Sequence, residues 1–338
     1  MWAYELRDGF GFDHLVRTER PDPHPGFGEV VVSMRAASLN YRDLLVVKGL
    51  YNPKMPLPRI PLSDGAGVVT AVGPSVTRVK AGDRVAGTFM QTYLDGEPDD
   101  VKGRSALGGA IDGVLAESVV FHENGLVHFP DHLSDEEAAT LPCAAVTAWN
   151  ALFEGPRRVG PGDTVLVLGT GGVSTFALQF AVLAGARVIA TSSSSQKLEL
   201  VRSMGAAATI NYRETSDWDR TVRELTLGTG VDHVVEVGGP GTLPLSLKAV
   251  RTGGVVSLIG VLSDPAGAVN PVPILMKSIT VRGIYVGSRS MFERMSRAIE
   301  AHHLRPVIDR TFSVHDIVPA LEHMESGAHF GKIVMSFQ

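Results

Sequence analysis

Cysteine is nearly absent from this chain, since Cys143 is the single one among 338 residues. One cysteine excludes an internal disulfide and any metal site built from several thiolates. Long apolar runs are also missing, because no segment reaches the roughly 18 residues that a membrane helix needs. Charged residues appear within the first eight positions, so the sequence predicts neither a secretory signal peptide nor a membrane segment. These absences favour a cytoplasmic protein.

An excess of positive charge is lacking as well. The chain holds 31 Lys and Arg against 36 Asp and Glu, a net charge of -5. It therefore has no basic footprint for nucleic acid or anionic lipid, and we expect neither as a partner. A length of 338 residues with 44% hydrophobic content exceeds one ordinary core, so two domains are expected.

The pattern of short apolar segments changes near residue 135. Before it, strand-like runs at 29–36, 65–73, 83–87 and 113–120 alternate with Gly and Pro turns, as in a compact barrel-like domain. After it, Ser134 and Glu137 form a capping-box signal for a helix that should end before Pro142. Short apolar strands then alternate with helices, which predicts a parallel sheet covered on both faces. The segment 291–338 is expected to fold back onto the first domain.

A glycine loop follows the apolar strand 164–168 and precedes a helix-like segment. It reads Gly169-Thr170-Gly171-Gly172-Val173-Ser174. Gly169 would permit the tight turn, and Gly171 would let the backbone approach a pyrophosphate at the helix N-terminus. Ser174 stands at the third glycine position and is small enough for close packing. In this strand–loop–helix setting the loop predicts dinucleotide binding.

The preference between NAD and NADP is suggested by the end of the next strand. An acidic residue there would bind the ribose 2′-hydroxyl of NAD, but positions 191–194 read Thr-Ser-Ser-Ser. Lys197 follows on the next helix, and Tyr212 with Arg213 ends the following strand. Hydroxyls and cations suit a 2′-phosphate, so NADP(H) is the predicted cofactor.

Several motifs together resemble the medium-chain dehydrogenase/reductase superfamily, in its zinc-free quinone-oxidoreductase-like branch. Besides the glycine loop they lie at 37–43, 61–67, 79–85, 139–149 and 331–334. The resemblance implies an α/β fold, with a GroES-like β-rich catalytic domain at 1–143, completed by 288–338. It implies a doubly wound Rossmann nucleotide-binding domain at 144–287. It further implies a homodimer, in which a strand like 278–285 can extend the sheet to the partner.

Zinc-dependent members of this superfamily bind the metal through Cys, His and Cys, and the matching positions here are Asn40, Ser63 and Cys143. Since a catalytic zinc needs three protein ligands, we expect no metal. Developing negative charge must then be stabilised by hydrogen-bond donors and by the substrate's own conjugation. The candidate catalytic residues are Asn40, Tyr41 and Arg42, in the loop that the resemblance places toward the nicotinamide, with Asp64 orienting one of them.

The predicted function is NADPH-dependent reduction of an activated C=C bond or a quinone, on a small-molecule enone, quinone or related carbonyl substrate. Two alternatives stay open: a zinc-free alcohol dehydrogenase or carbonyl reductase, and a non-catalytic NADPH-binding protein. The resemblance places Thr147, Gly260-Val261 and Val286-Gly287 beside the nicotinamide. The full set of predicted cofactor-binding residues is Thr147, Gly169, Thr170, Gly171, Gly172, Val173, Ser192, Ser193, Lys197, Tyr212, Gly238, Gly260, Val261, Val286, Gly287 and Lys332.

Overall fold

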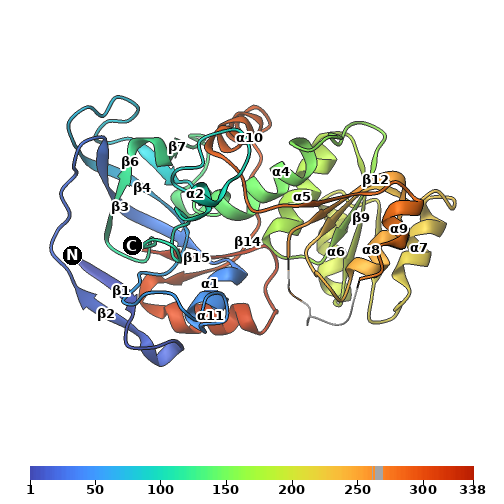
Figure 1. Cartoon of the computed structure of the whole chain (residues 1–338), viewed down its shortest axis with the longest axis horizontal. Coiled ribbons are helices and arrows are strands. Elements are labelled where there is room, and N and C mark those ends of the chain that lie inside the picture. Colours follow the sequence, from blue (N-terminus) through green and yellow to red (C-terminus); the bar gives the residue numbers. More distant parts are fainter. Residues whose placement is uncertain (261, 263–268) are drawn as a thin grey trace. The chain divides into compact units, whose positions relative to one another are not determined.

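The computed structural model describes residues 1–260, 262 and 269–338, and these form two compact units (Figure 1). Unit 1 comprises Met1–Val146 and Val286–Gln338, and unit 2 comprises Thr147–Tyr285. Within the described residues, none of the helices is both long and apolar enough to cross a membrane.

Unit 1 is dominated by strands, as the spacing of the apolar runs predicts. Its strands are β1 (Trp2–Leu6), β2 (Leu15–Glu19), β3 (Glu29–Ser38), β4 (Asp64–Val72), β5 (Arg84–Gly87), β6 (Ser118–His122), β7 (Leu126–His128), β14 (Ile308–Ser313) and β15 (Lys332–Ser336). Its helices are α1 (Tyr41–Val47), α2 (Asp100–Gly103), α3 (Asp135–Ala138), α4 (Val146–Phe153, which continues into unit 2), α10 (Arg289–Ala301) and α11 (Ile317–Glu325).

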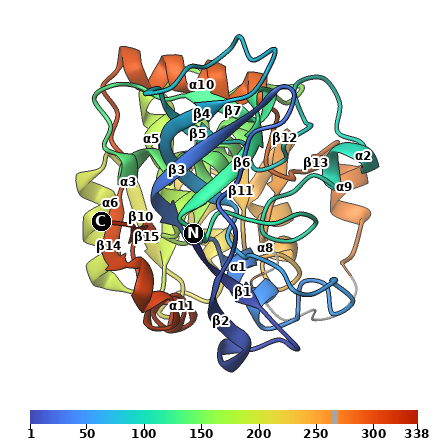
Figure 2. The same ribbon diagram turned by 90° about the vertical axis from the view of Figure 1, so that its left-hand side faces the viewer.

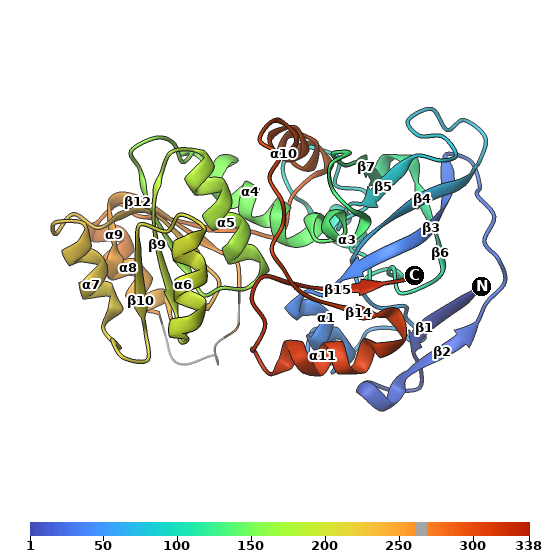
Figure 3. The same ribbon diagram turned by 180° about the vertical axis from the view of Figure 1, so that it is seen from behind.

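The main sheet of unit 1 is organised around β3. The strand order is β14-β15-β3-β4-β5-β7, and β6 also pairs with β3. Along β3 the alternate residues Val30, Val32 and Met34 enter the hydrophobic core, which is the period-2 burial expected of a strand. The last strand, β15, lies antiparallel beside β3 with Val334 opposite Ser38 (Figure 3). The C-terminal strand therefore extends the sheet of unit 1.

The capping box at Ser134 forms as predicted, because Oγ of Ser134 accepts the backbone N–H of Glu137 and the Glu137 carboxylate accepts that of Ser134. The helix it begins, α3, ends at Ala138. Pro142 then lies inside a π-helical turn, Leu141–Ala145, that leads into α4. The proline thus marks the irregular turn between two helices.

Unit 2 contains the strands β8 (Thr164–Leu168), β9 (Arg187–Ser192), β10 (Ala208–Asn211), β11 (Val231–Glu236), β12 (Val250–Leu258) and β13 (Thr280–Gly283). Its helices beyond α4 are α5 (Gly172–Leu183), α6 (Ser195–Ser203), α7 (Trp218–Leu225), α8 (Leu243–Ala249) and α9 (Val272–Met276).

The sheet of unit 2 is parallel throughout, with the order β10-β9-β8-β11-β12-β13. In chain order this is 3-2-1-4-5-6, the Rossmann arrangement. Helices α5 and α6 cover one face, and α8 and α9 cover the other (Figure 2). The central strands β8, β9 and β11 are buried on both sides, which explains why they appear in the sequence as continuous apolar runs. The predicted fold class, a GroES-like unit with a doubly wound Rossmann unit, is confirmed.

Candidate active site

The side chain of Asn40 lies in a buried hydrogen-bonded cluster of unit 1. Asn40 precedes α1, and its backbone N–H donates to Oδ2 of Asp43 at 2.9 Å. Its Oδ1 accepts from Nζ of Lys332 at 2.6 Å, and its Nδ2 donates to Oγ of Ser63 at 3.3 Å. Nζ of Lys332 also donates to the carbonyl of Leu39 at 2.7 Å. Strand pairing of β15 with β3 brings Lys332 to this place from 292 positions away.

The cluster continues to Asp64 at the start of β4. Oγ of Ser63 donates to Oδ1 of Asp64 at 2.8 Å, and the backbone N–H of Cys143 donates to Oδ2 at 2.9 Å. Ser63 thus links the carboxylate of Asp64 to the amide of Asn40, and the Asn40 side chain also interacts directly with Asp64. Ser63 and Asp64 are fully buried, and Asn40 is 9% exposed. Sequence reasoning did not single out Ser63 as part of the site, because that position signalled only the loss of a metal ligand.

Two carboxylates and two cations give the cluster nearly balanced charge. Burial raises the pKa of Asp64, while the ammonium of Lys332 opposes that increase. Burial likewise raises the pKa of Asp43 to about 6, with the guanidinium of Arg42 acting in the opposite direction. Burial also raises the pKa of the Cys143 thiol, and the Asp64 carboxylate adds to this increase. A thiol in these surroundings stays protonated at neutral pH, so Cys143 is poorly suited to nucleophilic catalysis.

The residues at the three zinc-ligand positions do not fit a zinc ion. Zinc in proteins is bound by thiolate, imidazole or carboxylate groups, whereas Asn40 and Ser63 offer an amide and a hydroxyl. The Lys332 ammonium lies 2.6 Å from Oδ1 of Asn40 and would repel a dication there. Across the residues that the structure describes, no group of three or more His, Cys, Asp or Glu side chains could hold a metal ion.

Tyr41 and Arg42, the other two candidate donors, differ in their surroundings. Tyr41 is the first residue of α1 and is 41% exposed. The Arg42 guanidinium donates to the carbonyl of Leu107 at 2.7 Å and lies over the rings of Tyr51 and Phe89, at 5.0 and 4.9 Å from their centroids. These contacts give Arg42 a role in the packing of unit 1, which leaves Asn40 and Tyr41 as the stronger candidates for substrate contact.

The glycine loop of unit 2 connects β8 to α5. Gly169 has a φ of 72°, a left-handed conformation that favours glycine, and its N–H donates to Oγ1 of Thr191 at 3.4 Å. Gly171 is the N-cap of α5, and a Cβ there would meet no atom within 4 Å. Oγ of Ser174 donates to the carbonyl of Leu168 at 2.7 Å, which ties the helix to the strand. The loop, with Thr170, Gly172 and Val173, thus has an open approach to a helix N-terminus, as a pyrophosphate requires.

The residues predicted to contact a 2′-phosphate lie beside this loop. The strands β8, β9 and β10 are adjacent and parallel, so their carboxyl ends share one edge of the sheet. Ser192 ends β9, and its carbonyl accepts the N–H of Tyr212 after β10 at 3.1 Å. Ser193 leads into α6, where Oγ of Ser194 accepts the N–H of Lys197 at 3.4 Å. The structure therefore brings the backbone of Ser192, Ser193, Lys197 and Tyr212 to one edge of the sheet.

A buried carboxylate that sequence reasoning missed holds the loop after β11. Glu236 accepts the N–H groups of Gly238 and Gly239 at 2.8 and 3.0 Å and the hydroxyl of Thr242 at 2.6 Å. A Cβ on Gly238 would lie 2.3 Å from Oγ1 of Thr242, so a glycine is needed there. A carboxylate at a strand end followed by two glycines is the signal that could have revealed this loop.

Three of the remaining predicted nicotinamide contacts, Thr147, Val286 and Gly287, lie at the positions where the chain passes from one unit to the other. Thr147 is buried in α4 at the start of unit 2. A Cβ on Gly260 would lie 1.9 Å from the carbonyl oxygen of Val237, so the backbone passes too closely for any side chain. Val286 and Gly287 are buried where the chain returns to unit 1. Val261 lies outside the described residues.

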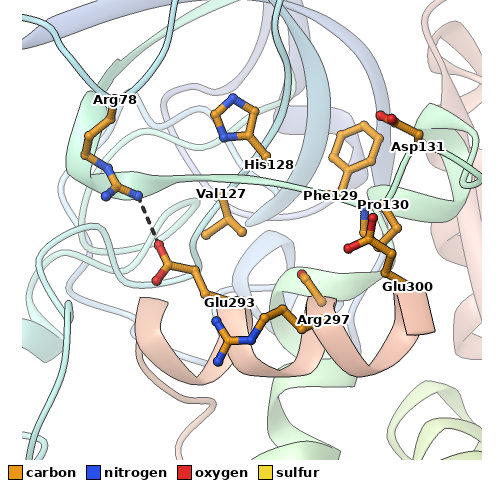
Figure 4. A pocket seen from close by; sticks show the side chains of 10 residues that line it. Arg78, Val127, His128, Phe129, Pro130, Asp131, Glu293, Arg297 and Glu300 are labelled. Carbon is orange, nitrogen blue, oxygen red and sulfur yellow. Dashed lines mark hydrogen bonds and ion pairs between the residues drawn. The ribbon is translucent and has the colours of Figure 1, made fainter. Parts of the chain in front are cut away.

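A cavity of about 360 Å³ lies elsewhere in unit 1, between β7 and α10. Arg78 bonds to Glu293 at 3.0 Å along one side of it (Figure 4). The lining includes side chains of both charge signs. The lining residues are Arg78, Val127, His128, Phe129, Pro130, Asp131, Glu293, Ser296, Arg297 and Glu300. None of the predicted catalytic or cofactor-binding residues lines this cavity.

A Rossmann unit with a glycine loop, joined to a GroES-like unit, defines a class of two-domain α/β oxidoreductases. Residues 26–131 match the alcohol dehydrogenase GroES-like domain family, and residues 172–301 match the zinc-binding dehydrogenase family. The chain belongs to the medium-chain dehydrogenase/reductase superfamily.

Similar proteins carry the names of dehydrogenases and reductases. A zinc-type alcohol dehydrogenase-like protein of Schizosaccharomyces pombe is 48% identical, with 96% of each chain covered. A 2-methylene-furan-3-one reductase of Solanum lycopersicum is 32% identical over 99% of this chain and 78% of its own length. The crystal structure of a putative alcohol dehydrogenase from Sinorhizobium meliloti has a TM-score of 0.91 and 43% identity, covering 99% of this chain and 98% of its own.

Proposed function

We propose that the protein is a zinc-independent, NADPH-dependent reductase that transfers hydride to an activated C=C bond or a quinone. The observation that carries the proposal is the amide of Asn40, which stands at a metal-ligand position and is held by the Lys332 ammonium. Hydride addition to an enone or quinone builds negative charge on a carbonyl oxygen. The substrate's conjugation delocalises this charge, so a neutral hydrogen-bond donor is sufficient to stabilise it.

In this proposal Asn40 and Tyr41 act on the substrate. Nδ2 of Asn40 donates a hydrogen bond to the carbonyl oxygen as its charge develops. The Tyr41 hydroxyl donates a second hydrogen bond and supplies the proton that completes the reduction. NADPH, when bound, supplies the hydride. Arg42 and Asp64 contribute by holding α1 and the start of β4 in place.

The cofactor preference rests on the sheet edge that carries Ser192, Ser193, Lys197 and Tyr212. Their hydroxyl and ammonium groups suit the 2′-phosphate of NADPH. One similar crystal structure is named as an NAD-dependent alcohol dehydrogenase, with 35% identity and a TM-score of 0.91 over the whole of both chains. The preference therefore needs a direct titration with both cofactors.

The name of the tomato relative favours reduction of a C=C bond, because a 2-methylene-furan-3-one is a conjugated enone. The second candidate function is a zinc-free alcohol dehydrogenase or carbonyl reductase, and the alcohol dehydrogenase names of other relatives favour it. A non-catalytic NADPH-binding role is the third. NADPH consumption should be measured across quinones, enones, enoyl thioesters and simple ketones. Turnover of enones or quinones alone supports the proposal; turnover of ketones alone supports the second candidate, and no turnover supports the third.

Metal content provides an independent test of zinc independence. Elemental analysis of protein purified without chelator should show no stoichiometric zinc, and dialysis against EDTA should leave the turnover unchanged. One bound zinc per chain, lost together with activity, would contradict the assignment of Asn40 and Ser63 as hydrogen-bonding groups.

We also propose that two copies of the chain associate through unit 2, and that the protein acts in the cytoplasm. The strand β13 forms an edge of the sheet, and α9 before it exposes Leu275 and Met276 by 77% and 74%. An open edge beside exposed apolar side chains suits a second copy. Light scattering should give a dimer mass, and Leu275→Asp with Met276→Asp should shift it toward the monomer. A monomeric wild-type protein would overturn this assignment.

A further inference from the structure

The side-chain amide of Asn40 could in principle adopt two orientations that exchange its oxygen and nitrogen. The two ends have nearly the same shape, so neighbouring donors and acceptors decide between them. A lysine ammonium carries donors only, and Nζ of Lys332 lies 2.6 Å from one end of the amide. That end must therefore be the oxygen, because a second donor there would meet the ammonium hydrogens.

The other end of the amide is consequently the NH₂ group. One of its hydrogens points to Oγ of Ser63 at 3.3 Å, and that hydroxyl donates its own hydrogen to Asp64. This NH₂ group is the end of the amide that can donate a hydrogen bond to a substrate oxygen. The direction of every hydrogen bond from Lys332 to Asp64 thus follows from the donor-only ammonium at one end and the carboxylate at the other.

We propose that Lys332 is a positioning residue, which fixes the Asn40 amide with its N–H groups toward Ser63 and the substrate. The inference deepens the proposed function and rests on it, because Asn40 is the donor that the substrate oxygen would use. The ammonium also polarises the amide, which makes Nδ2 a stronger donor. This role is distinct from the predicted contact of Lys332 with the dinucleotide, since it acts on kcat through Asn40 and leaves cofactor affinity unchanged.

A double-mutant cycle separates these roles. Lys332→Met removes the ammonium but keeps an unbranched side chain, and it should lower kcat for the best enone or quinone roughly 10- to 100-fold. The dissociation constant of NADPH, measured by fluorescence titration, should stay within about twofold. In an Asn40→Ala background the same change at Lys332 should lower kcat by less than about twofold. Fully additive losses, or weakened NADPH binding with intact kcat, would overturn the proposal.

Two further variants test orientation in case Lys332→Met does not fold. Lys332→Arg keeps a donor-only group at this position. It should therefore keep most of the kcat that Lys332→Met loses. Lys332→Gln offers either an oxygen or an NH₂ to Asn40, so both amide orientations become possible and kcat should fall below that of Lys332→Arg. Equal kcat values in folded Arg and Gln variants, with matching melting temperatures, would contradict an orienting role.

A spectroscopic measurement keeps the inference testable even if no substrate is found. The side-chain ¹H–¹⁵N peaks of Asn40, assigned by their loss in Asn40→Ala, should show slow hydrogen exchange in the wild-type protein. In Lys332→Gln they should exchange at least about tenfold faster, because the amide is no longer held at its oxygen. Unchanged exchange would overturn the role of Lys332. Failure of the proposed function would instead show itself as absent turnover by the wild-type protein with these peaks still protected.

Discussion

Oδ2 of Asp64 accepts the backbone N–H of Cys143 at 2.9 Å, which joins the start of β4 to the π-helical turn before α4. The other carboxylate oxygen holds Ser63, and through Ser63 the amide of Asn40. Asp64 is thus the point where three separate segments of unit 1 meet. The backbone of Cys143, rather than its thiol, contributes to the cluster, because the protonated thiol has little nucleophilic character.

Gly171→Ala should weaken dinucleotide binding without destabilising the protein. The new methyl group would meet no protein atom within 4 Å, and the φ of Gly171, -78°, suits alanine. It would occupy the space through which a pyrophosphate approaches the helix, so we expect the NADPH dissociation constant to rise about tenfold or more. Gly160→Ala, where a Cβ also has open space, is the matched control. Unchanged affinity in Gly171→Ala would show that the dinucleotide does not use this loop.

Lys197→Ala should weaken NADPH by about 1–3 kcal/mol, the range for a charge-assisted hydrogen bond, and leave NADH unaffected. Wild-type protein should bind NADPH more tightly than NADH. Fluorescence titration with both cofactors measures the two effects, and Lys54→Ala, an exposed lysine of unit 1, controls for a general loss of charge. A wild-type preference for NADH would overturn the assignment of NADP(H).

Asn40→Ala and Tyr41→Phe should each lower kcat more than they change cofactor affinity. Loss of one well-placed donor to a developing oxyanion costs about 2.7–4 kcal/mol, or roughly 100- to 1,000-fold in rate. Steady-state kinetics with the best substrate and NADPH titration of the same variants separate the two quantities. If both variants keep full kcat, these side chains belong to the scaffold and the proton comes from elsewhere.

Asp43→Asn should change how stability depends on pH. The pKa of Asp43 is about 6 in the folded protein and about 3.9 in an unfolded chain, so the folded state holds this proton more tightly. The contribution of Asp43 to stability is therefore fully present below about pH 4 and is lost as the pH rises to about 6. Asparagine cannot ionise and avoids this loss.

Between pH 4 and pH 7 the free energy of unfolding of Asp43→Asn should rise relative to wild type by about 2–3 kcal/mol. Urea unfolding of both proteins at several pH values measures the difference, and Asp131→Asn, at an exposed position, is the control. A difference that stays constant with pH would show that folding does not raise the pKa of Asp43.

Local patterns made much of the molecule predictable. The apolar runs that became β3, β8 and β11, the capping box at Ser134 and the glycine loop each depend on neighbours a few positions apart. Pro142 predicts the limit of a helix because proline disrupts α-helical hydrogen bonding, and α3 does end before it, at Ala138, with the proline in the π-helical turn that follows. The hairpin-like pair β1 and β2 was not predicted, since its strands are short and mixed in polarity.

The sequence by itself determined the two-unit organisation, the parallel Rossmann sheet and the position of the glycine loop, because periodicity and turn chemistry act over short stretches of chain. It also predicted which side chains stand at the zinc-ligand positions of the superfamily. Only the tertiary structure decided what those side chains contact. Lys332 meets Asn40 because the register of β15 against β3 joins residues 292 positions apart, and no local pattern specifies that register. This pairing also buries the cluster. Each hydrogen bond in it therefore contributes to stability, because a buried polar group without a partner raises the free energy of the folded state.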